Sequence, residues 1–84
     1  MPVYLTFFKK LSVKIAKIYS LNISNKKLEG DLNLEGFVNL EILNCGENML
    51  TSLELSNCKQ LREIDCSFNN IINIFFYIII FAPK

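Results

Sequence analysis

A 21-residue pattern that repeats at once constrains this chain more than any other feature of its sequence. The stretch LEILNCGENMLTSLELSNCKQ fills residues 40–60, and LREIDCSFNNIINI follows at residues 61–74 in nearly the same order of apolar and polar residues. The positions that match at a spacing of 21 residues are Leu40 and Leu61, Leu43 and Ile64, Cys45 and Cys66, Asn48 and Asn69, Leu50 and Ile71, and Leu53 and Ile74. A fixed period of this length predicts a stack of similar coils.

A third and less regular copy precedes these two at residues 18–39. The residues that keep the framework spacing in it are Ile18, Leu21, Ile23 and Leu28. One extra residue then shifts the next apolar pair to Leu32 and Leu34, which makes this copy 22 residues long. We refer to residues 18–39, 40–60 and 61–74 as repeats one, two and three, and the third is incomplete.

The spacing within a repeat indicates two segments that face a common interior. Leu43 and Cys45 are two residues apart, so in a strand both side chains point to the same side. Leu53 and Leu55 repeat this spacing on the return path of the same coil. Each coil is therefore expected to be held by apolar side chains from two sides.

Asn48 and Asn69 stand where each chain segment leaves its strand and turns. An inward asparagine side chain can pair with backbone donors and acceptors that the turn would leave unpaired. Stacked coils would align these asparagines in a ladder. Repeat one has Lys26 at this position, so we expect it to lack that rung and to turn more loosely.

This pattern resembles the leucine-rich repeat family, in a variant of the form L-x-x-L-x-C-x-x-N-x-L-T-x-L-x-L-S-x-C-x-x. The resemblance covers Ile18 to Ile74, about two-thirds of the chain. It implies an α/β fold, a leucine-rich-repeat solenoid shaped as a short right-handed horseshoe, with parallel strands on the concave face. It also implies protein binding without catalysis.

The two ends of the chain depart from the repeat. Residues 1–17 are expected to form a basic amphipathic helix that caps the first coil, because apolar residues recur there at three- and four-residue intervals. A membrane-surface helix is the alternative for this segment, and Val3 to Phe8 is also compatible with a strand.

Residues 75–84 form an apolar tail. Between residues 71 and 82 only Asn73 is polar, and this run is shorter than the roughly 17–20 residues that a spanning helix needs. Three interpretations remain open. The tail covers the open end of the last coil as a strand, it anchors in a membrane, or it replaces further repeats of a truncated chain.

A protein partner would contact the outward residues of the concave face. The residues predicted to bind it are Ile42, Asn44, Glu47, Glu63, Asp65 and Phe68. Phe68 is the preferred single contact because binding energy concentrates on aromatic residues, and its alternative role is packing at the exit turn. Each partner in a standard protein–protein interface buries roughly 800 Å² of surface. Three short coils provide less than this area, and we therefore expect weak binding.

The sequence lacks the groups that catalysis or metal binding needs. It contains no histidine, only three cysteines without a CxxC motif, no glycine-rich phosphate loop and no paired-carboxylate motif. Cys45 and Cys66 occupy core leucine positions, where cysteine acts as a small apolar residue. We therefore expect no enzymatic activity, no cofactor and no metal.

Charge is distributed unevenly along the chain. Residues 1–28 contain six lysines and no acidic residue, although the net charge is only +1. Nucleic-acid binding is not favoured, because no arginine accompanies these lysines. The leading hypothesis is a cytoplasmic protein-interaction module. The alternative is a small membrane-associated protein that uses the basic N-terminal helix and the apolar run at residues 71–82.

Overall fold

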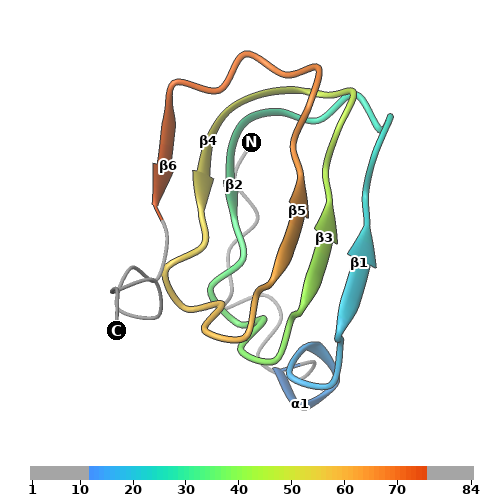
Figure 1. Cartoon of the computed structure of the whole chain (residues 1–84), viewed down its shortest axis with the longest axis vertical. Coiled ribbons are helices and arrows are strands. Elements are labelled where there is room, and N and C mark those ends of the chain that lie inside the picture. Colours follow the sequence, from blue (N-terminus) through green and yellow to red (C-terminus); the bar gives the residue numbers. More distant parts are fainter. Residues whose placement is uncertain (1–11, 76–84) are drawn as a thin grey trace.

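The computed structural model describes residues 12–75 of the chain (Figure 1). Its elements in chain order are the single helical turn α1 (Ser12–Ile15) and the strands β1 (Ser20–Asn22), β2 (Glu29–Asn33), β3 (Ile42–Asn44), β4 (Met49–Glu54), β5 (Glu63–Asp65) and β6 (Asn73–Phe75). Most of the predicted cap helix and nearly all of the apolar tail lie outside the described residues.

The strands form two parallel sheets, and each repeat contributes one strand to each of them. The first sheet has the order β1-β3-β5 and the second has the order β2-β4-β6 (Figure 1). The return path of each coil is thus a strand. Within residues 12–75, α1 is the only helical part of the expected α/β fold. The right-handed horseshoe and the helical cap stay predictions.

The register of both sheets follows the apolar framework of the sequence. Leu21, Leu43 and Ile64 are paired across the first sheet. Leu32 pairs with Leu53 in the second sheet, and Leu53 pairs with Ile74. A one-residue slip would turn these side chains away from the interior, so their burial fixes the register.

The extra length of repeat one lies elsewhere than the sequence predicts. The expected partner of Leu50 is Leu28, but Gly30 pairs with Leu50 instead. The register then shifts between Gly30 and Asp31, and Gly30 has a φ of 78°, which glycine adopts without the steric cost of a side chain. The turn before β2 is therefore longer than the turn before β4, and it contains two left-handed residues, Asn25 with a φ of 53° and Lys27 with a φ of 58°.

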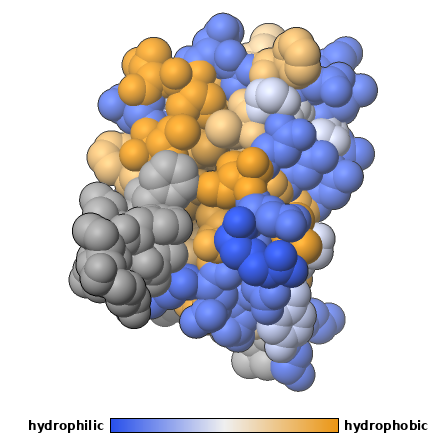
Figure 2. Space-filling model, viewed as in Figure 1, coloured by the Kyte–Doolittle hydropathy of each residue, from blue (hydrophilic) through white to orange (hydrophobic). Residues whose placement is uncertain are grey.

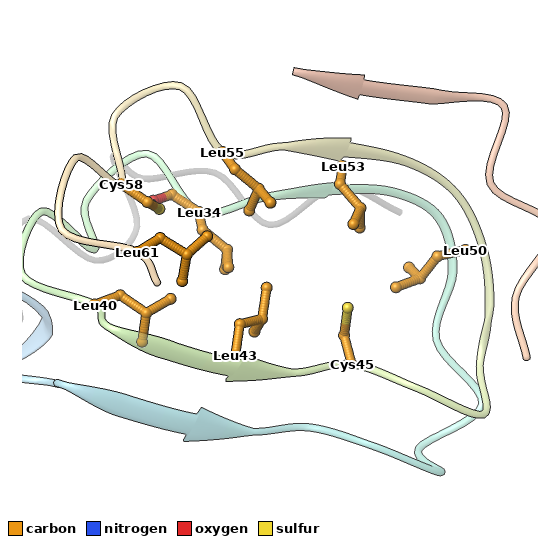
Figure 3. Packing of buried hydrophobic residues seen from close by; sticks show 9 residues of the cluster. All are labelled: Leu34, Leu40, Leu43, Cys45, Leu50, Leu53, Leu55, Cys58 and Leu61. Atoms are coloured by element: carbon orange, nitrogen blue, oxygen red, sulfur yellow. The ribbon is translucent and has the colours of Figure 1, made fainter. Parts of the chain in front are cut away.

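The hydrophobic core lies between the two sheets and belongs mainly to repeat two. Figure 3 shows side chains from the β3 side pointing toward those from the β4 side. The buried apolar residues are Leu34, Leu40, Leu43, Cys45, Leu50, Leu53, Leu55, Cys58 and Leu61. Repeat two is covered by a neighbour on each side, whereas Leu21 and Ile64 in the outer repeats are only half-buried. Burial in a stack thus depends on adjacent coils.

Asn48 joins repeats one and two through its side chain, as predicted. Its Oδ1 accepts hydrogen bonds from the backbone N–H groups of Lys26 and Leu28, both at 3.0 Å. Its Nδ2 donates to three backbone carbonyls, those of Ile23 at 3.1 Å, Cys45 at 2.9 Å and Gly46 at 3.1 Å. Only 7% of Asn48 is exposed, so these backbone groups would otherwise be unpaired away from water.

Asn69 forms the next rung between repeats two and three. Its Oδ1 accepts from the N–H of Leu50 at 2.8 Å. Its Nδ2 donates to the carbonyls of Cys45 at 3.0 Å, Cys66 at 3.2 Å and Ser67 at 3.3 Å. The predicted asparagine ladder is therefore present at both junctions.

Replacement of Asn48 by alanine tests the stabilising role of this rung. We expect Asn48→Ala to lower the free energy of unfolding by about 3 kcal/mol, because several poorly hydrated backbone groups lose their partner at once. Denaturant unfolding measures this loss. The matched control is Asn57→Ala at an exposed turn position, which should change stability by less than about 0.5 kcal/mol. Equal effects of the two substitutions would contradict the ladder.

Candidate interaction face

The outward residues of the first sheet form a face that we call the strand face. Its members are Ser20, Asn22, Ile42, Asn44, Glu63 and Asp65. Pairing across the sheet aligns them in two rows, Ser20–Ile42–Glu63 and Asn22–Asn44–Asp65. Four of the six residues predicted to bind a partner therefore lie on adjacent strands.

Ile42 is the apolar member of the strand face. It is half-buried, with Ser20 on one neighbouring strand and Glu63 on the other. The structure thus places an apolar side chain between polar neighbours, an arrangement that a partner's apolar group can cover while polar groups contact the rim.

The second row of the strand face also completes the turns that follow the strands. The Oδ1 atom of Asn44 accepts a hydrogen bond from the Gly46 N–H at 3.1 Å. The Asp65 Oδ1 accepts from the N–H of Ser67 at 3.0 Å and from its hydroxyl at 2.6 Å. In repeat one, the Asn22 Oδ1 accepts from the N–H of Ser24 at 3.0 Å and from the Ser24 hydroxyl at 2.7 Å. One oxygen of each side chain is therefore engaged in the fold.

The hydrogen bonds from Ser67 also lower the pKa of Asp65. The Ser67 hydroxyl and N–H together hold the pKa of this carboxyl below its ordinary value. Asp65 is ionised at neutral pH, as an ordinary aspartate is, and the lowered pKa keeps its negative charge on one edge of the strand face to more acidic pH.

Gly46 interrupts the outward positions that follow the strands. Its counterparts in the other repeats are Ser24 and Ser67, which carry side chains, whereas Gly46 is buried. A Cβ atom there would lie 3.2 Å from the Ser67 carbonyl oxygen and 3.3 Å from Asp65 Oδ1. The close backbone approach at this junction explains the glycine and leaves no side chain for a partner.

Glu47 and Phe68 lie at the corner of the coil, beyond the strand face. Both are exposed and have left-handed backbones, with φ of 55° and 57°, and Asn25 has the equivalent value of 53° in repeat one. Phe68 is 80% exposed, so its ring makes little contact with neighbouring residues. The structure therefore separates these two predicted contact residues from the other four.

The sequence reasoning missed an ionic group beside the strand face. Arg62 Nε lies 3.3 Å from Glu41 Oε1, and Arg62 Nη1 lies 3.4 Å from Glu63 Oε1. The sequence did contain a signal for this ion pair, because Glu41 and Arg62 carry opposite charges and are one repeat of 21 residues apart. Because Arg62 and Glu63 are exposed and Glu41 is partly exposed, these pairs contribute little to stability, but they orient charge at one edge of the face.

The three cysteines have different environments. Cys45 and Cys58 are buried free thiols, and Cys66 is half-buried in the outer repeat. Burial, with nearby Cys66 and Asp65, raises the pKa of Cys45 to about 11. Burial, with Glu54 nearby, raises the pKa of Cys58 to about 11 as well.

Within residues 12–75 no group of three or more histidine, cysteine, aspartate or glutamate side chains is arranged to hold a metal ion.

Several apolar side chains of repeat three and its flank are exposed. Ile72 is 79% exposed and Phe75 is 51% exposed. Figure 2 shows hydrophobic surface gathered on the β6 side of the molecule. Among residues 12–75, no helix has the length and the hydropathy that are needed to cross a membrane.

Each repeat contributes one strand to each of two parallel sheets, and this arrangement defines a protein built from stacked coils. Comparison with known families narrows this class, because residues 38–77 match the model for leucine-rich repeats in two copies. These residues are therefore similar to leucine-rich repeats, as the sequence pattern predicted. Domains of this family generally mediate protein–protein interactions and are typically non-catalytic. Neither a curated protein nor a solved structure gives a significant match.

The cysteine environments predict a pH dependence of stability. An unfolded thiol ionises near its ordinary pKa of 9.0, whereas the folded Cys45 and Cys58 thiols hold their protons to about pH 11. The folded state therefore binds more protons than the unfolded state between pH 9 and 11, and the free energy of unfolding should fall as pH rises through this window.

Denaturant unfolding at several pH values measures that slope, and Cys58→Ala should make it shallower by removing one of the two thiols. Asn57→Ala provides the matched control, because it changes an exposed turn residue next to Cys58 and keeps both buried thiols. A slope that is unchanged in Cys58→Ala would contradict the assignment.

Proposed function

We propose that this chain is a non-catalytic protein-interaction module that binds a partner protein through the strand face, on the concave side of the stack. The observation that carries the proposal is the alignment of six outward side chains in two rows, with Ile42 at the middle of one row. None of these six residues belongs to the buried apolar core. A partner can therefore contact them without disturbing the packing between the sheets.

The chemistry of the strand face favours a partner with an apolar side chain flanked by basic residues. Ile42 offers the apolar contact, and Glu63 and Asp65 on the next strand are exposed acids. The bonds from Ser67 lower the pKa of Asp65, which favours its ionised form. Complementary charge of this kind steers a partner and fixes its orientation more than it adds affinity.

We also propose that the array is a truncated form of a longer stack. In repeat two, Leu43 and Leu50 are each 1% exposed, whereas their counterparts Ile64 and Ile71 in repeat three are only half-buried. An additional coil would cover them as repeat three covers repeat two. The small strand face of the present array is consistent with weak binding by this chain alone.

A photo-crosslinking amino acid at Ser20, beside Ile42, can capture and identify a partner of the full chain. We expect Ile42→Asp to weaken binding of the identified partner at least about tenfold, because it replaces the apolar contact by a charge. The affinity is measured with purified partner, after unfolding experiments have shown that the variant is folded.

The matched control is Val38→Asp, which adds the same charge at an exposed apolar residue outside the strand face. It should leave the affinity within about twofold. Equal affinity of the Ile42→Asp variant and the unmodified chain would refute the strand face as the binding surface. Phe68→Ala then tests whether the corner of the coil extends this surface.

A further inference from the structure

The two junctions between repeats use the same backbone hydrogen bonds. The Ile23 N–H donates to the Asn44 carbonyl at 2.8 Å, and one repeat later the Cys45 N–H donates to the Asp65 carbonyl at 2.8 Å. At the turn, the Asn25 N–H donates to the Gly46 carbonyl at 3.1 Å. In the next repeat, its counterpart is the bond from the Glu47 N–H to the Ser67 carbonyl at 2.8 Å.

The asparagine ladder adds a third shared element to each junction. The N–H of Leu28 donates to Asn48, and the N–H of Leu50 donates to Asn69. The carbonyl of Ile23 likewise accepts from Asn48, and the carbonyl of Cys45 accepts from Asn69. Each repeat thus relies on an asparagine of the repeat that follows it.

Within residues 12–75, the same backbone groups of repeat three lack these partners. The counterparts of the donors above are the N–H groups of Cys66, Phe68 and Ile71, and they have no hydrogen-bond acceptor within residues 12–75. The Cys66 carbonyl accepts from its own repeat's Asn69 but from no following asparagine in the described range. We call this surface, with the outer edges of β5 and β6, the end face.

The end face also exposes apolar side chains that a following coil would cover. Ile74 is 37% exposed, although its partner Leu53 in the adjacent strand is fully buried. Ile64, Cys66 and Ile71 are half-buried for the same reason. The end face therefore combines an apolar centre with three aligned backbone donors, which suits a strand that adds to an open sheet edge.

We propose that the end face binds a leucine-rich-repeat coil supplied by another protein, whose turn carries an asparagine at the ladder position. That asparagine would accept from the Ile71 N–H and donate to the Cys66 carbonyl, as Asn69 does for Leu50 and Cys45. Apolar residues of the incoming coil would cover Ile64 and Ile74. This proposal does not rest on the function proposed for the strand face.

A second copy of this chain fits the end face less well. In a head-to-tail stack its repeat one would present Lys26 at the ladder position, and an ammonium group can donate but cannot accept from the Ile71 N–H. In a two-fold pair, antiparallel β5 strands would bring Glu63 and Asp65 of the two copies close together, and such like charges are destabilising. A coil that carries the asparagine avoids both conflicts.

The test uses the full chain and a synthetic 21-residue peptide with the sequence of residues 40–60, under reducing conditions. A second peptide differs only by alanine at the position of Asn48. Amide hydrogen exchange of the isotopically labelled chain is followed by NMR. We expect saturating asparagine peptide to slow exchange of the Cys66, Phe68 and Ile71 amides about tenfold or more, and the alanine peptide to bind about tenfold more weakly.

The amides of Cys45, Glu47 and Leu50 are internal controls, because their acceptors lie within the chain. Unchanged exchange at the three end-face amides would overturn the proposal. Equal protection and affinity with the two peptides would overturn the asparagine requirement and with it the proposed partner. Slow exchange at these amides in the free chain would show that the end face is already occupied, and this outcome would also overturn the proposal.

Discussion

The asparagine side chain at the coil corner is the interaction on which the rest of this structure depends. A chain that must turn sharply between two parallel sheets leaves backbone N–H and carbonyl groups without strand partners, and water cannot reach them. Asn48 supplies partners for two donors and three acceptors at once, and these groups belong to two different repeats. The same side chain therefore shapes one coil and attaches it to the previous one.

Stacking then determines which residues become core. Repeat two has a neighbour on each side, and its framework residues Leu40, Leu43 and Leu53 are essentially inaccessible to solvent. Leu21 and Ile64, the counterparts of Leu43 at the two ends of the described stack, have a neighbouring coil on one side only within residues 12–75 and stay half-buried. Stability in such a fold is shared between repeats. Because each coil depends on its neighbours for burial, the terminal coils keep partly exposed apolar residues. The strand face and the end face are thus separate surfaces with different chemistry.

Much of this arrangement could be predicted from the sequence, because burial imposes a strict spacing. The pairing of Leu43 with Ile64 and the inward asparagines follow from a period of 21 residues, and the structure contains both. The pairing of Gly30 with Leu50 could not be predicted, because apolar spacing does not fix the length of a polar turn. The register shift that follows this longer turn skips Thr51 of repeat two, and such a shift leaves no pattern of apolar residues in the sequence.

The candidate site was predictable only where strand geometry governs it. Ile42, Asn44, Glu63 and Asp65 are aligned because alternate residues of paired strands share a face. Glu47 and Phe68 diverge from them because their left-handed backbones turn the chain at the corner. Gly46 is buried by the close approach of the next coil, and this contact depends on three-dimensional stacking that no single repeat reveals.

The most direct test of this account is the amide exchange of Leu28 and Leu50 in the Asn48→Ala variant. The Leu28 amide is bonded to Asn48 and the Leu50 amide to Asn69, in the same chemical arrangement one repeat apart. If asparagine rungs hold the coils together one junction at a time, the variant should lose protection at Leu28 while Leu50 retains more of it. Unchanged protection at Leu28, or an equal loss at both amides, would contradict the account.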